Sequence, residues 1–254
     1  MQAYPFLLSC RMNRLTTLLS DFSSQYNVLE RRFQINDRTL TIISPADIND
    51  LIEKISSKQF IIDERLPYWA EVWHSGIALA KTIDSCPALV EGKDILDMGC
   101  GLGITGVIAG LYADKVTFAD YEPDALIASE INALKNGIVT EAAYECLDFR
   151  QPPGRKWEVV IAADVVYEKR FREPLLKFFS EAVADSGIIL ITEPNRTVAT
   201  GFFDDAVEAG FTRKSSTMSA VMNENYVDVS VHLLSKDAAA LEGFIVEGEG
   251  FTHV

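Results

Sequence analysis

The first 60 residues alternate between a helix-like and a strand-like pattern of apolar side chains. Residues 11–31 repeat apolar positions at helical spacing, which predicts an amphipathic helix. Two β-prone runs then flank the turn pair Asn36-Asp37, which predicts a hairpin; the runs cover residues 32–35 and 39–43. Ser44-Pro45-Ala46-Asp47 favours the start of a short helix that we expect to end near Ser56. Residues 1–60 therefore predict a small N-terminal α+β extension.

In residues 61–254, which we expect to form the main domain, short apolar runs alternate with helical stretches. The apolar runs cover residues 94–98, 116–119, 143–147, 159–163 and 188–192. The helical stretches cover residues 104–113, 123–136, 171–184 and 198–209. Ser186-Gly187 and Gly210 stand where helices are expected to stop. This alternation predicts an α/β fold, a mostly parallel sheet with helices on both faces.

The last part of the chain departs from this alternation. Residues 211–220 and 226–234 have the pattern of two strands, and the polar residues 222–225 form a turn between them. We therefore expect the sheet to finish with an antiparallel pair, which the simple repeat of a dinucleotide dehydrogenase lacks.

The charge of the chain bears on its partners. Its 254 residues include 23 Lys+Arg and 37 Asp+Glu, a formal net charge of −14. This charge repels a phosphate backbone and no basic patch offsets it, so we expect no nucleic-acid partner. Residues 1–60 carry a net charge of +1, and residues 61–254 carry −15. The surplus acid either attracts a cationic ligand or a basic protein surface, or simply keeps the protein dispersed in water.

Cysteine usage and the length of the apolar runs bear on location. The four cysteines contain no C-x-x-C pair; they are Cys10, Cys86, Cys100 and Cys146. This pattern is typical of reduced thiols, so we expect a cytoplasmic protein. No segment has the ~18 uninterrupted apolar residues of a membrane helix, and we expect no membrane partner. Nothing in the sequence indicates an oligomeric state.

The most informative segment is a strand that runs into a glycine-rich turn and then a helix. It reads Ile95-Leu96-Asp97-Met98-Gly99-Cys100-Gly101-Leu102-Gly103-Ile104-Thr105-Gly106. Glycines here allow a tight turn and the close approach of a ligand, so Gly99, Gly101 and Gly103 are predicted to bind a cofactor. Gly101-x-Gly103-x-x-Gly106 followed by Asp120 also satisfies the dinucleotide fingerprint, which is weak evidence by itself.

Asp97, at the end of that strand, distinguishes two classes of cofactor. A pyrophosphate beside this carboxylate would meet like-charge repulsion, whereas an ammonium group would gain an ion pair and hydrogen bonds. S-adenosylmethionine carries an ammonium group and no phosphate. We therefore expect S-adenosylmethionine as the cofactor, and a dinucleotide oxidoreductase is the distant alternative.

Two further acids follow the next two strands. Asp120 is placed to accept hydrogen bonds from both ribose hydroxyls, and Asp148 from the adenine amino group, while Phe149 offers an apolar face. An aspartate in a turn is common and means little alone. Three of them after successive parallel strands lie at the edge where such sheets bind ligands, which predicts one cofactor site.

These residues resemble the class I, seven-strand S-adenosylmethionine-dependent methyltransferases over about residues 60–235. The motif is Asp97-x-Gly99-x-Gly101-x-Gly103, with Asp120 and Asp148 following. Glu71-x-Trp73 before the first strand and Asp164-Val165-Val166-Tyr167 after the fourth resemble, more narrowly, the nicotinamide-N-methyltransferase-like and protein lysine methyltransferase branch. The resemblance implies a Rossmann-like sheet of seven strands and, for this branch, a lysine acceptor on a protein.

The resemblance also implies roles around the cofactor. Glu71 and Trp73 would help to form the cofactor pocket, and Asp164 and Tyr167 would border the site of methyl transfer. A carboxylate at Asp164 can orient a cationic amine; the alternative is that Asp164 caps a helix. Tyr167 could instead pack at the rim against the next helix, and Trp73 could be a core aromatic.

Three neighbouring features have less defined roles. Trp69 is either a core aromatic or part of the pocket. His74 has no Cys, Asp or Glu at metal-ligand spacing, so we expect a structural or pocket-lining role and no metal site. Glu193-Pro194-Asn195-Arg196, after the fifth strand, either shapes the acceptor pocket or forms a turn.

The segment 164–167 also bears on the acceptor. In the family's pattern, methyltransferases of adenine and glutamine nitrogens carry Pro-Pro-aromatic at this place, and this chain lacks that motif. We predict an N-methyltransferase in which a protein lysine attacks the sulfonium methyl in line, with catalysis by close positioning. The alternatives are a small amine or a nicotinamide-like heterocycle as acceptor, and a cofactor-binding module without catalysis.

Overall fold

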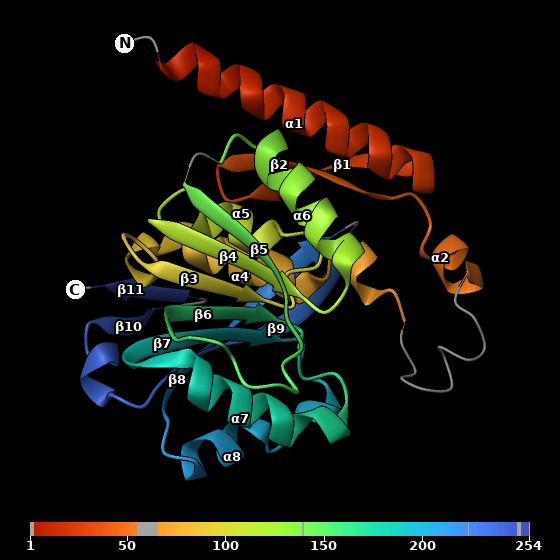
Figure 1. Ribbon diagram of the computed structural model, residues 1–254. Coiled ribbons are helices and arrows are strands. Elements are labelled where there is room, and N and C mark those ends of the chain that lie inside the picture. The colour runs from red at the N-terminus through yellow and green to blue at the C-terminus, as the bar shows by residue number, and fades with distance from the viewer. Residues whose placement is uncertain (1–2, 55–65, 139, 223, 248–249, 254) are drawn as a thin grey trace.

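A seven-stranded sheet forms the centre of the computed structural model, which describes residues 3–54, 66–138, 140–222, 224–247 and 250–253. The strand order is β5-β4-β3-β6-β7-β9-β8 (Figure 1). The strands are β3 (Asp94–Met98), β4 (Lys115–Asp120), β5 (Glu141–Cys146), β6 (Trp157–Ala163), β7 (Val183–Glu193), β8 (Thr212–Met222) and β9 (Asn225–Ser235). The first five run parallel, and β9 is antiparallel to β7 and β8. The predicted fold class is confirmed.

Alternate residues of the central strands face different helical layers. In β3, Ile95 belongs to the core on one side of the sheet, and Leu96 belongs to the core on the other. Val159 and Val160 of β6 divide in the same way. Successive side chains of a strand point to opposite faces, and both faces are buried here. These strands are therefore continuous apolar runs in the sequence.

Helices cover both faces of the sheet. The first core includes residues of α4 (His74–Ser85), α5 (Ile104–Ala109) and α6 (Pro123–Lys135). The second includes residues of α7 (Arg172–Ala182) and α8 (Phe202–Glu208), which lie at the lower front in Figure 1. Short 3-10 turns connect the elements: η1 (Tyr68–Ala70), η2 (Pro87–Leu89), η3 (Lys169–Phe171), η4 (Thr197–Ala199) and η5 (Ala238–Leu241).

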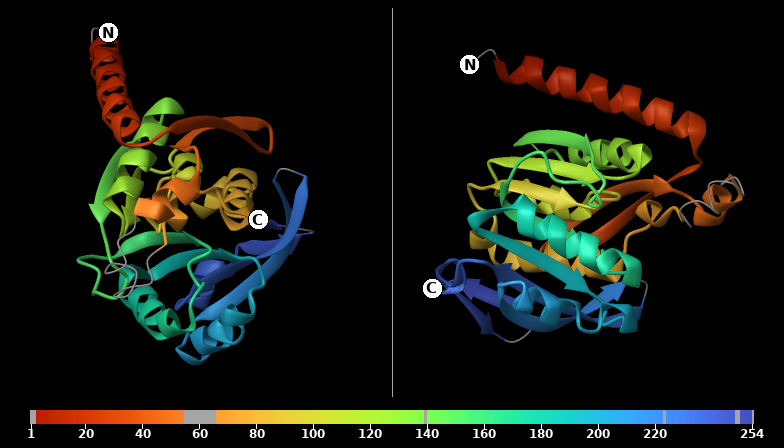
Figure 2. Two further views of the ribbon diagram at one scale, coloured as in Figure 1. Left: turned by 90° about the vertical axis from the view of Figure 1, so that its right-hand side faces the viewer. Right: turned by 60° about the horizontal axis from the view of Figure 1, so that its bottom comes forward.

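The N-terminal segment packs on the layer that contains α6. Its elements are α1 (Ala3–Gln25), β1 (Val28–Ile35), β2 (Arg38–Pro45) and α2 (Ile48–Lys54). Figure 2 shows α1 along the outside of the molecule, beside α6. Arg14 pairs with Glu130 of α6 at 2.8 Å, and the Tyr26 hydroxyl donates to Asp124 of the same helix at 2.5 Å. Phe22 joins the first core.

Two asparagines, Asn132 of α6 and Asn136 directly after it, bind the outer edge of β2. Asn132 accepts a hydrogen bond from the Ile43 amide at 2.7 Å and donates to its carbonyl at 3.0 Å. Asn136 makes the same pair of bonds with Thr41, at 3.0 and 2.8 Å. Four helical residues rise about 6 Å and two strand residues about 6.7 Å, so the spacings match. The polar edge of the hairpin is therefore satisfied by a helix instead of a strand.

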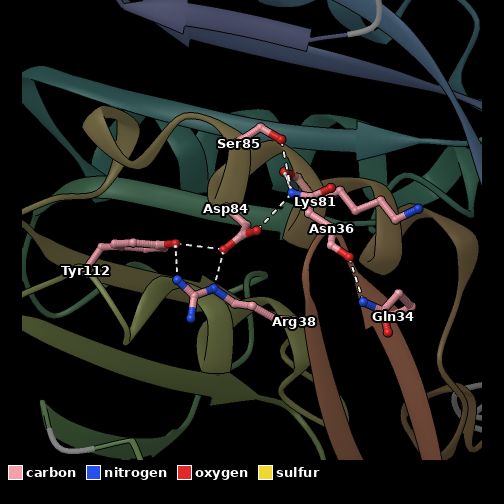
Figure 3. Close-up of polar contacts among 7 residues, drawn as sticks. All are labelled: Gln34, Asn36, Arg38, Lys81, Asp84, Ser85 and Tyr112. Atoms are coloured by element: carbon pink, nitrogen blue, oxygen red, sulfur yellow. Dashed lines mark hydrogen bonds and ion pairs between the residues drawn. The ribbon is translucent and has the colours of Figure 1, made fainter.

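The turn of the hairpin binds the C-terminal end of α4 (Figure 3). Asn36 has a left-handed φ of 48°, and its amide donates to Asp84 at 2.9 Å and to the Lys81 carbonyl at 3.1 Å. Arg38 and the Tyr112 hydroxyl each donate to Asp84 at 2.7 Å. Burial raises the pKa of Asp84, but these hydrogen bonds outweigh it and bring the pKa below its ordinary value. The predicted Asn36-Asp37 turn is confirmed.

Several predicted boundaries in the extension are wrong. α1 extends further toward the N-terminus than predicted and ends at Gln25, because the hairpin already begins at Val28. The short helix predicted to open at Ser44-Pro45-Ala46-Asp47 is confirmed as α2, but it begins only at Ile48, because Ser44 and Pro45 still pair with β1 in the hairpin. The predicted helix end near Ser56 and the domain boundary after residue 60 lie outside the described residues.

Two further differences lie in the second half of the chain. Ser186-Gly187 does not stop a helix but lies inside β7. A Cβ on Gly187 would lie 2.6 Å from the Glu158 carbonyl oxygen, so this glycine allows the close approach of two strands. The C-terminal hairpin of β10 (Phe244–Glu247) and β11 (Gly250–His253) was not predicted. The predicted stop at Gly210 is confirmed, with a φ of 95° after α8.

Candidate active site

A cavity of about 570 Å³ lies at the carboxyl ends of the parallel strands. The loops that follow β3, β4, β5, β6 and β7 all contribute to its lining, together with η1 and the start of α4. Its size is within the usual range of sites for small molecules and cofactors. Most of the residues predicted for the site line this cavity; they are Glu71, Trp73, Gly99, Gly101, Asp120, Asp148, Phe149, Asp164 and Tyr167.

The glycine turn after β3 forms one wall. Gly99, Gly101 and Gly103 have left-handed φ values of 66°, 49° and 79°. A Cβ on Gly101 would lie 3.2 Å from the Trp69 carbonyl oxygen, so the turn is closely packed. Gly103 precedes α5 and is absent from the lining, and a Cβ there would lie 2.8 Å from that of Ser129. Glycine is therefore required for shape at this turn.

Asp97 does not occupy the position that its predicted ion pair requires. It is 1% exposed, is absent from the cavity lining, and accepts hydrogen bonds from the Thr105 hydroxyl and the Gly106 amide. Burial raises its pKa to about 7, although both hydrogen bonds act to lower it. Asp97 alternates with Leu96 and Met98, and so it faces α5 behind the turn. Its contacts brace the glycine turn.

Asp120, at the end of β4, lies directly on the cavity. One carboxylate oxygen accepts from the Gly101 amide and the other from the Glu122 amide, both at 2.9 Å. Burial raises its pKa to about 6, against the effect of these hydrogen bonds. Asp120 therefore connects the loop after β4 to the glycine turn, and its remaining lone pairs can accept from a ligand hydroxyl.

The loop after β5 forms one end of the cavity. Arg150 donates to both oxygens of Asp148, at 2.8 and 2.9 Å, and its backbone amide also donates to this carboxylate. The rings of Phe149 and Phe171 pack edge to face at 5.4 Å. This end presents an apolar face beside an aspartate that already has a cationic partner.

Aromatic rings surround the other end. Tyr68 packs edge to face with Trp73 at 6.0 Å and with Tyr167 at 5.7 Å, and Tyr167 packs in turn with Phe171 at 5.9 Å. The indole of Trp73 donates to the Tyr68 carbonyl at 2.9 Å. Burial raises the pKa of Tyr167 to about 12. Trp73 is 36% exposed and Tyr167 is 37% exposed, so both rings are open to solvent at this end.

Asp164, after β6, is paired with Arg196, after β7. The guanidinium donates to both carboxylate oxygens, at 2.9 and 2.8 Å. Asp164 has a left-handed φ of 58°, which aspartate tolerates, and its amide donates to the Thr192 carbonyl at 2.8 Å. The alternative reading of Asp164 as a helix cap is wrong, because the next helical turn starts at Lys169.

The N-terminal extension supports the cavity from behind. Arg31 of β1 donates to the Glu71 carboxylate at 3.2 Å through two of its nitrogens. Trp69 packs edge to face against Phe22 and Tyr26 of the extension, at 6.4 and 6.1 Å. Trp69 is buried and also lines the cavity, so both of its proposed roles hold at once.

His74 begins α4 but is absent from the cavity lining. Within the described residues its buried Nε2 has no hydrogen-bond partner. Among the described residues, no group of three or more His, Cys, Asp or Glu side chains is arranged to hold a metal ion. No helix in the described part of the chain is long and apolar enough to cross a membrane.

Several lining residues were not singled out from the sequence. They are Glu122, Arg150, Glu168 and Phe171. All of them adjoin a predicted residue or lie within five positions of one, so position along the chain was a usable signal. Arg196 belongs to a segment for which a pocket or a turn role was open, and its side chain lines the cavity.

The sequence matches a known protein family and several of its relatives. The model of the lysine methyltransferase family matches residues 63–209. The electron transfer flavoprotein beta subunit lysine methyltransferase of Danio rerio is 29% identical over 134 residues, 51% of this chain and 51% of that protein. The protein N-terminal and lysine N-methyltransferase EFM7 of Candida glabrata is 25% identical over 194 residues, 68% of this chain and 75% of that protein. The chain thus spans about half the length of the flavoprotein methyltransferases that it matches.

Solved structures are similar to the chain in fold. A putative RNA methyltransferase from Pyrococcus horikoshii has a TM-score of 0.52 at 17% identity and covers 75% of this chain and 95% of its own. The N-methyltransferase NodS from Bradyrhizobium japonicum, in complex with S-adenosyl-L-homocysteine, has a TM-score of 0.51 at 12% identity and covers 75% and 98%. The family match extends over more than half of the sequence, and so this chain belongs to the lysine methyltransferase family.

Proposed function

We propose that this protein is an S-adenosylmethionine-dependent N-methyltransferase that modifies a lysine side chain of a protein. One observation carries the proposal: a single cavity has the glycine turn and Asp120 on one wall, and Asp164 among aromatic rings at one end. The names of the relatives from Danio rerio and Candida glabrata, both lysine methyltransferases, support lysine as the acceptor.

The residues present fit S-adenosylmethionine. Gly99 and Gly101 have left-handed φ values and line the cavity, and their backbone would bind the amino-acid part of the cofactor. Asp120 would accept from the ribose hydroxyls with the oxygen lone pairs that its two amide contacts leave free. Asp148 and Phe149 would contact the adenine.

Other predicted residues would act on the cofactor indirectly. Asp97 and Gly103 would set the shape of the glycine turn from behind. Glu71 would close the pocket together with Arg31, and Trp73 would form part of its wall. This arrangement gives Asp97 a different role from the direct ion pair that the sequence suggested.

S-adenosylmethionine supplies an electrophilic methyl group on a positively charged sulfur. The chain's residues have to exclude water and hold the acceptor nitrogen in line, an effect worth up to about 7–11 kcal/mol in model reactions. Tyr68, Trp73 and Tyr167 would form the aromatic channel for the amine. With a pKa of about 12, Tyr167 is protonated at neutral pH and is not a general base there.

Labelling of proteins tests the proposal. The purified protein is incubated with S-adenosylmethionine that carries a labelled methyl group and with a cell lysate, and the products are separated by size and hydrolysed. Label in methylated lysine on a protein band is the expected result. Label found only in small molecules would overturn the lysine proposal, and no label at all, despite binding of S-adenosylhomocysteine, would favour a module without catalysis.

We also propose a cytoplasmic location and no nucleic-acid partner. The free cysteines in the described part of the chain, two buried and two exposed, support a reducing compartment. The net charge of −14 supports a partner other than a nucleic acid. Fractionation of cells that contain the tagged protein, with and without nuclease treatment, tests both statements.

A further inference from the structure

Arg196 places a positive charge at the end of the cavity assigned to the acceptor. It follows β7, and its side chain is 40% exposed, whereas that of Asp164 is 9% exposed. The guanidinium carbon lies 6.0 Å from the centre of the Trp73 ring, so the cation is beside the aromatic channel. The backbone amide of Arg196 donates to Glu193 at 3.0 Å, which fixes the start of this loop.

The ion pair with Arg196 takes up both oxygens of Asp164. A bidentate arginine–carboxylate pair is strong and well oriented. The hydrogen bond to Asp164 raises the pKa of Arg196 further above its ordinary value, so the guanidinium stays charged at every working pH. The pair as a whole is neutral, and Asp164 does not present an unpaired negative charge to an incoming ammonium group.

The other charged groups at the cavity do not change the charge balance between Asp164 and Arg196. Three carboxylates have arginine partners: Glu71 with Arg31, Asp148 with Arg150, and Glu168 with Arg170. Besides the arginines, the remaining titratable groups of the lining are Tyr68, Cys100, Asp120, Tyr121, Glu122 and Tyr167. Asp120 accepts two backbone amides, and Glu193, which accepts the Arg196 amide, is buried with a pKa that burial raises. Arg196 is therefore the cation closest to Asp164 and decides its effective charge.

We propose that Arg196 is a positioning residue that neutralises Asp164, so that the acceptor end of the cavity takes an amine in its unprotonated form. This inference rests on the proposed function. The ammonium leaves its proton in solvent before entry, and the neutral nitrogen then has the lone pair that forms the new N–C bond. The electrons of the broken S–C bond stay on sulfur. Without Arg196, Asp164 would bind the unreactive ammonium form instead.

A pair of ligands measures this charge without any protein substrate. Sinefungin carries an amine at the place of the transferred methyl group, and S-adenosylhomocysteine carries nothing there. The ratio of their affinities, measured by calorimetry between pH 6 and 9, reports how well the cavity accepts an ammonium group. An unpaired carboxylate nearby shifts an amine pKa upward by about 1–3 units, so Arg196→Gln should raise the relative affinity for sinefungin at pH 7 about tenfold or more.

Two matched variants complete the test. Arg196→Lys keeps the charge and should leave the ratio near that of the wild type. Arg150→Gln removes the arginine from the Asp148 pair at the other end of the cavity, and should change both affinities in parallel. A structural role of Arg196 alone would likewise lower both affinities together.

The outcomes separate the inference from the function on which it rests. An unchanged ratio in Arg196→Gln, with both ligands still bound, overturns the inference and leaves the proposed function intact. If the wild type binds neither ligand, the proposed function fails. If Arg196→Gln does not fold, the wild type still decides the matter: because the cavity prefers the unprotonated amine, the ratio must rise with pH up to the pKa of the free sinefungin amine, and a ratio that falls as pH rises overturns the inference.

Discussion

Replacing Gly103 with alanine tests whether the glycine turn is rigid for steric reasons. Gly103 has a φ of 79°, and a Cβ there would lie 2.8 Å from the Ser129 Cβ and 3.1 Å from the Ser129 Cα. The second of these atoms belongs to the backbone of α6 and cannot move away by a rotamer change. The alanine therefore has to displace either the turn or the helix.

The expected loss of stability follows from three contributions. A left-handed conformation costs a non-glycine residue about 1–2 kcal/mol. Alanine also restricts the unfolded chain, which offsets about 0.4–1 kcal/mol of that cost. Overpacking adds about 1–3 kcal/mol. We expect Gly103→Ala to destabilise the protein by about 3 kcal/mol, which lowers the melting temperature of a chain of this size by roughly 6–12 °C.

Gly137 is a matched control for the clash. Its φ is 72°, close to that of Gly103, but no heavy atom lies within 4 Å of the Cβ position. Gly137→Ala should therefore cost only about 1 kcal/mol, the strain less the entropic gain. Calorimetric unfolding compares the two variants, and titration with S-adenosylhomocysteine should show weaker binding for Gly103→Ala alone. Equal losses of stability in both variants would refute the steric argument.

The remaining expected results concern three residues: Asp120, Asp164 and Tyr26. Asp120 has a pKa of about 6 and should accept ribose hydroxyls only as the carboxylate. The affinity for S-adenosylhomocysteine should therefore rise with pH through 6 and be about tenfold lower at pH 5 than at high pH. An affinity that does not change with pH contradicts this. The same raised pKa means that the folded state binds more protons than the unfolded state between about pH 4 and 6, so this contribution to stability falls as pH rises there. Asp164→Ala should retain the affinity for S-adenosylhomocysteine and should label proteins about a hundredfold more slowly than the wild type. Labelling at the full rate would show that Asp164 has no role in methyl transfer. Tyr26→Phe should lower the melting temperature by about 2–4 °C, because it removes the hydrogen bond to Asp124, and an unchanged midpoint would show that this contact does not hold α1 in place.

The sheet could be predicted from the sequence because its strands are buried on both faces. Such strands are short continuous apolar runs, and the run at residues 159–163 corresponds to the end of β6. Gly187 shows the limit of this reading. A glycine after a helical stretch has the same local signal whether it ends a helix or lets two strands approach, and only the Glu158 carbonyl next to it decides.

The residues of the candidate site could be predicted from the local sequence, but their hydrogen-bond partners could not. That aspartates would stand at the carboxyl ends of four parallel strands is a local property: Asp97 and Asp120 lie within the last two residues of β3 and β4, and Asp148 and Asp164 come within two residues after β5 and β6. Their partners come from other elements: Arg196 lies 32 residues from Asp164, and Arg31 lies 40 residues from Glu71. No periodicity in the sequence specifies such pairs. Asp97 is the exception, because its partners Thr105 and Gly106 lie only eight and nine residues further along the chain.

The pairing of carboxylates also changes what the net charge of −14 can do. The surplus acid suggested a field that attracts a cationic acceptor. At the cavity, however, Asp148, Asp164 and Glu71 each contact an arginine, so these three acids add little net negative charge to its lining. A neutralised Asp164 at the acceptor end favours the unprotonated amine that the reaction needs, whereas acids outside the cavity can still attract a basic protein over about a Debye length. Attracting a basic protein needs negative charge, whereas taking up its lysine as the unprotonated amine needs little negative charge at the acceptor end. The arginines at the cavity allow one acidic chain to meet both requirements in different places.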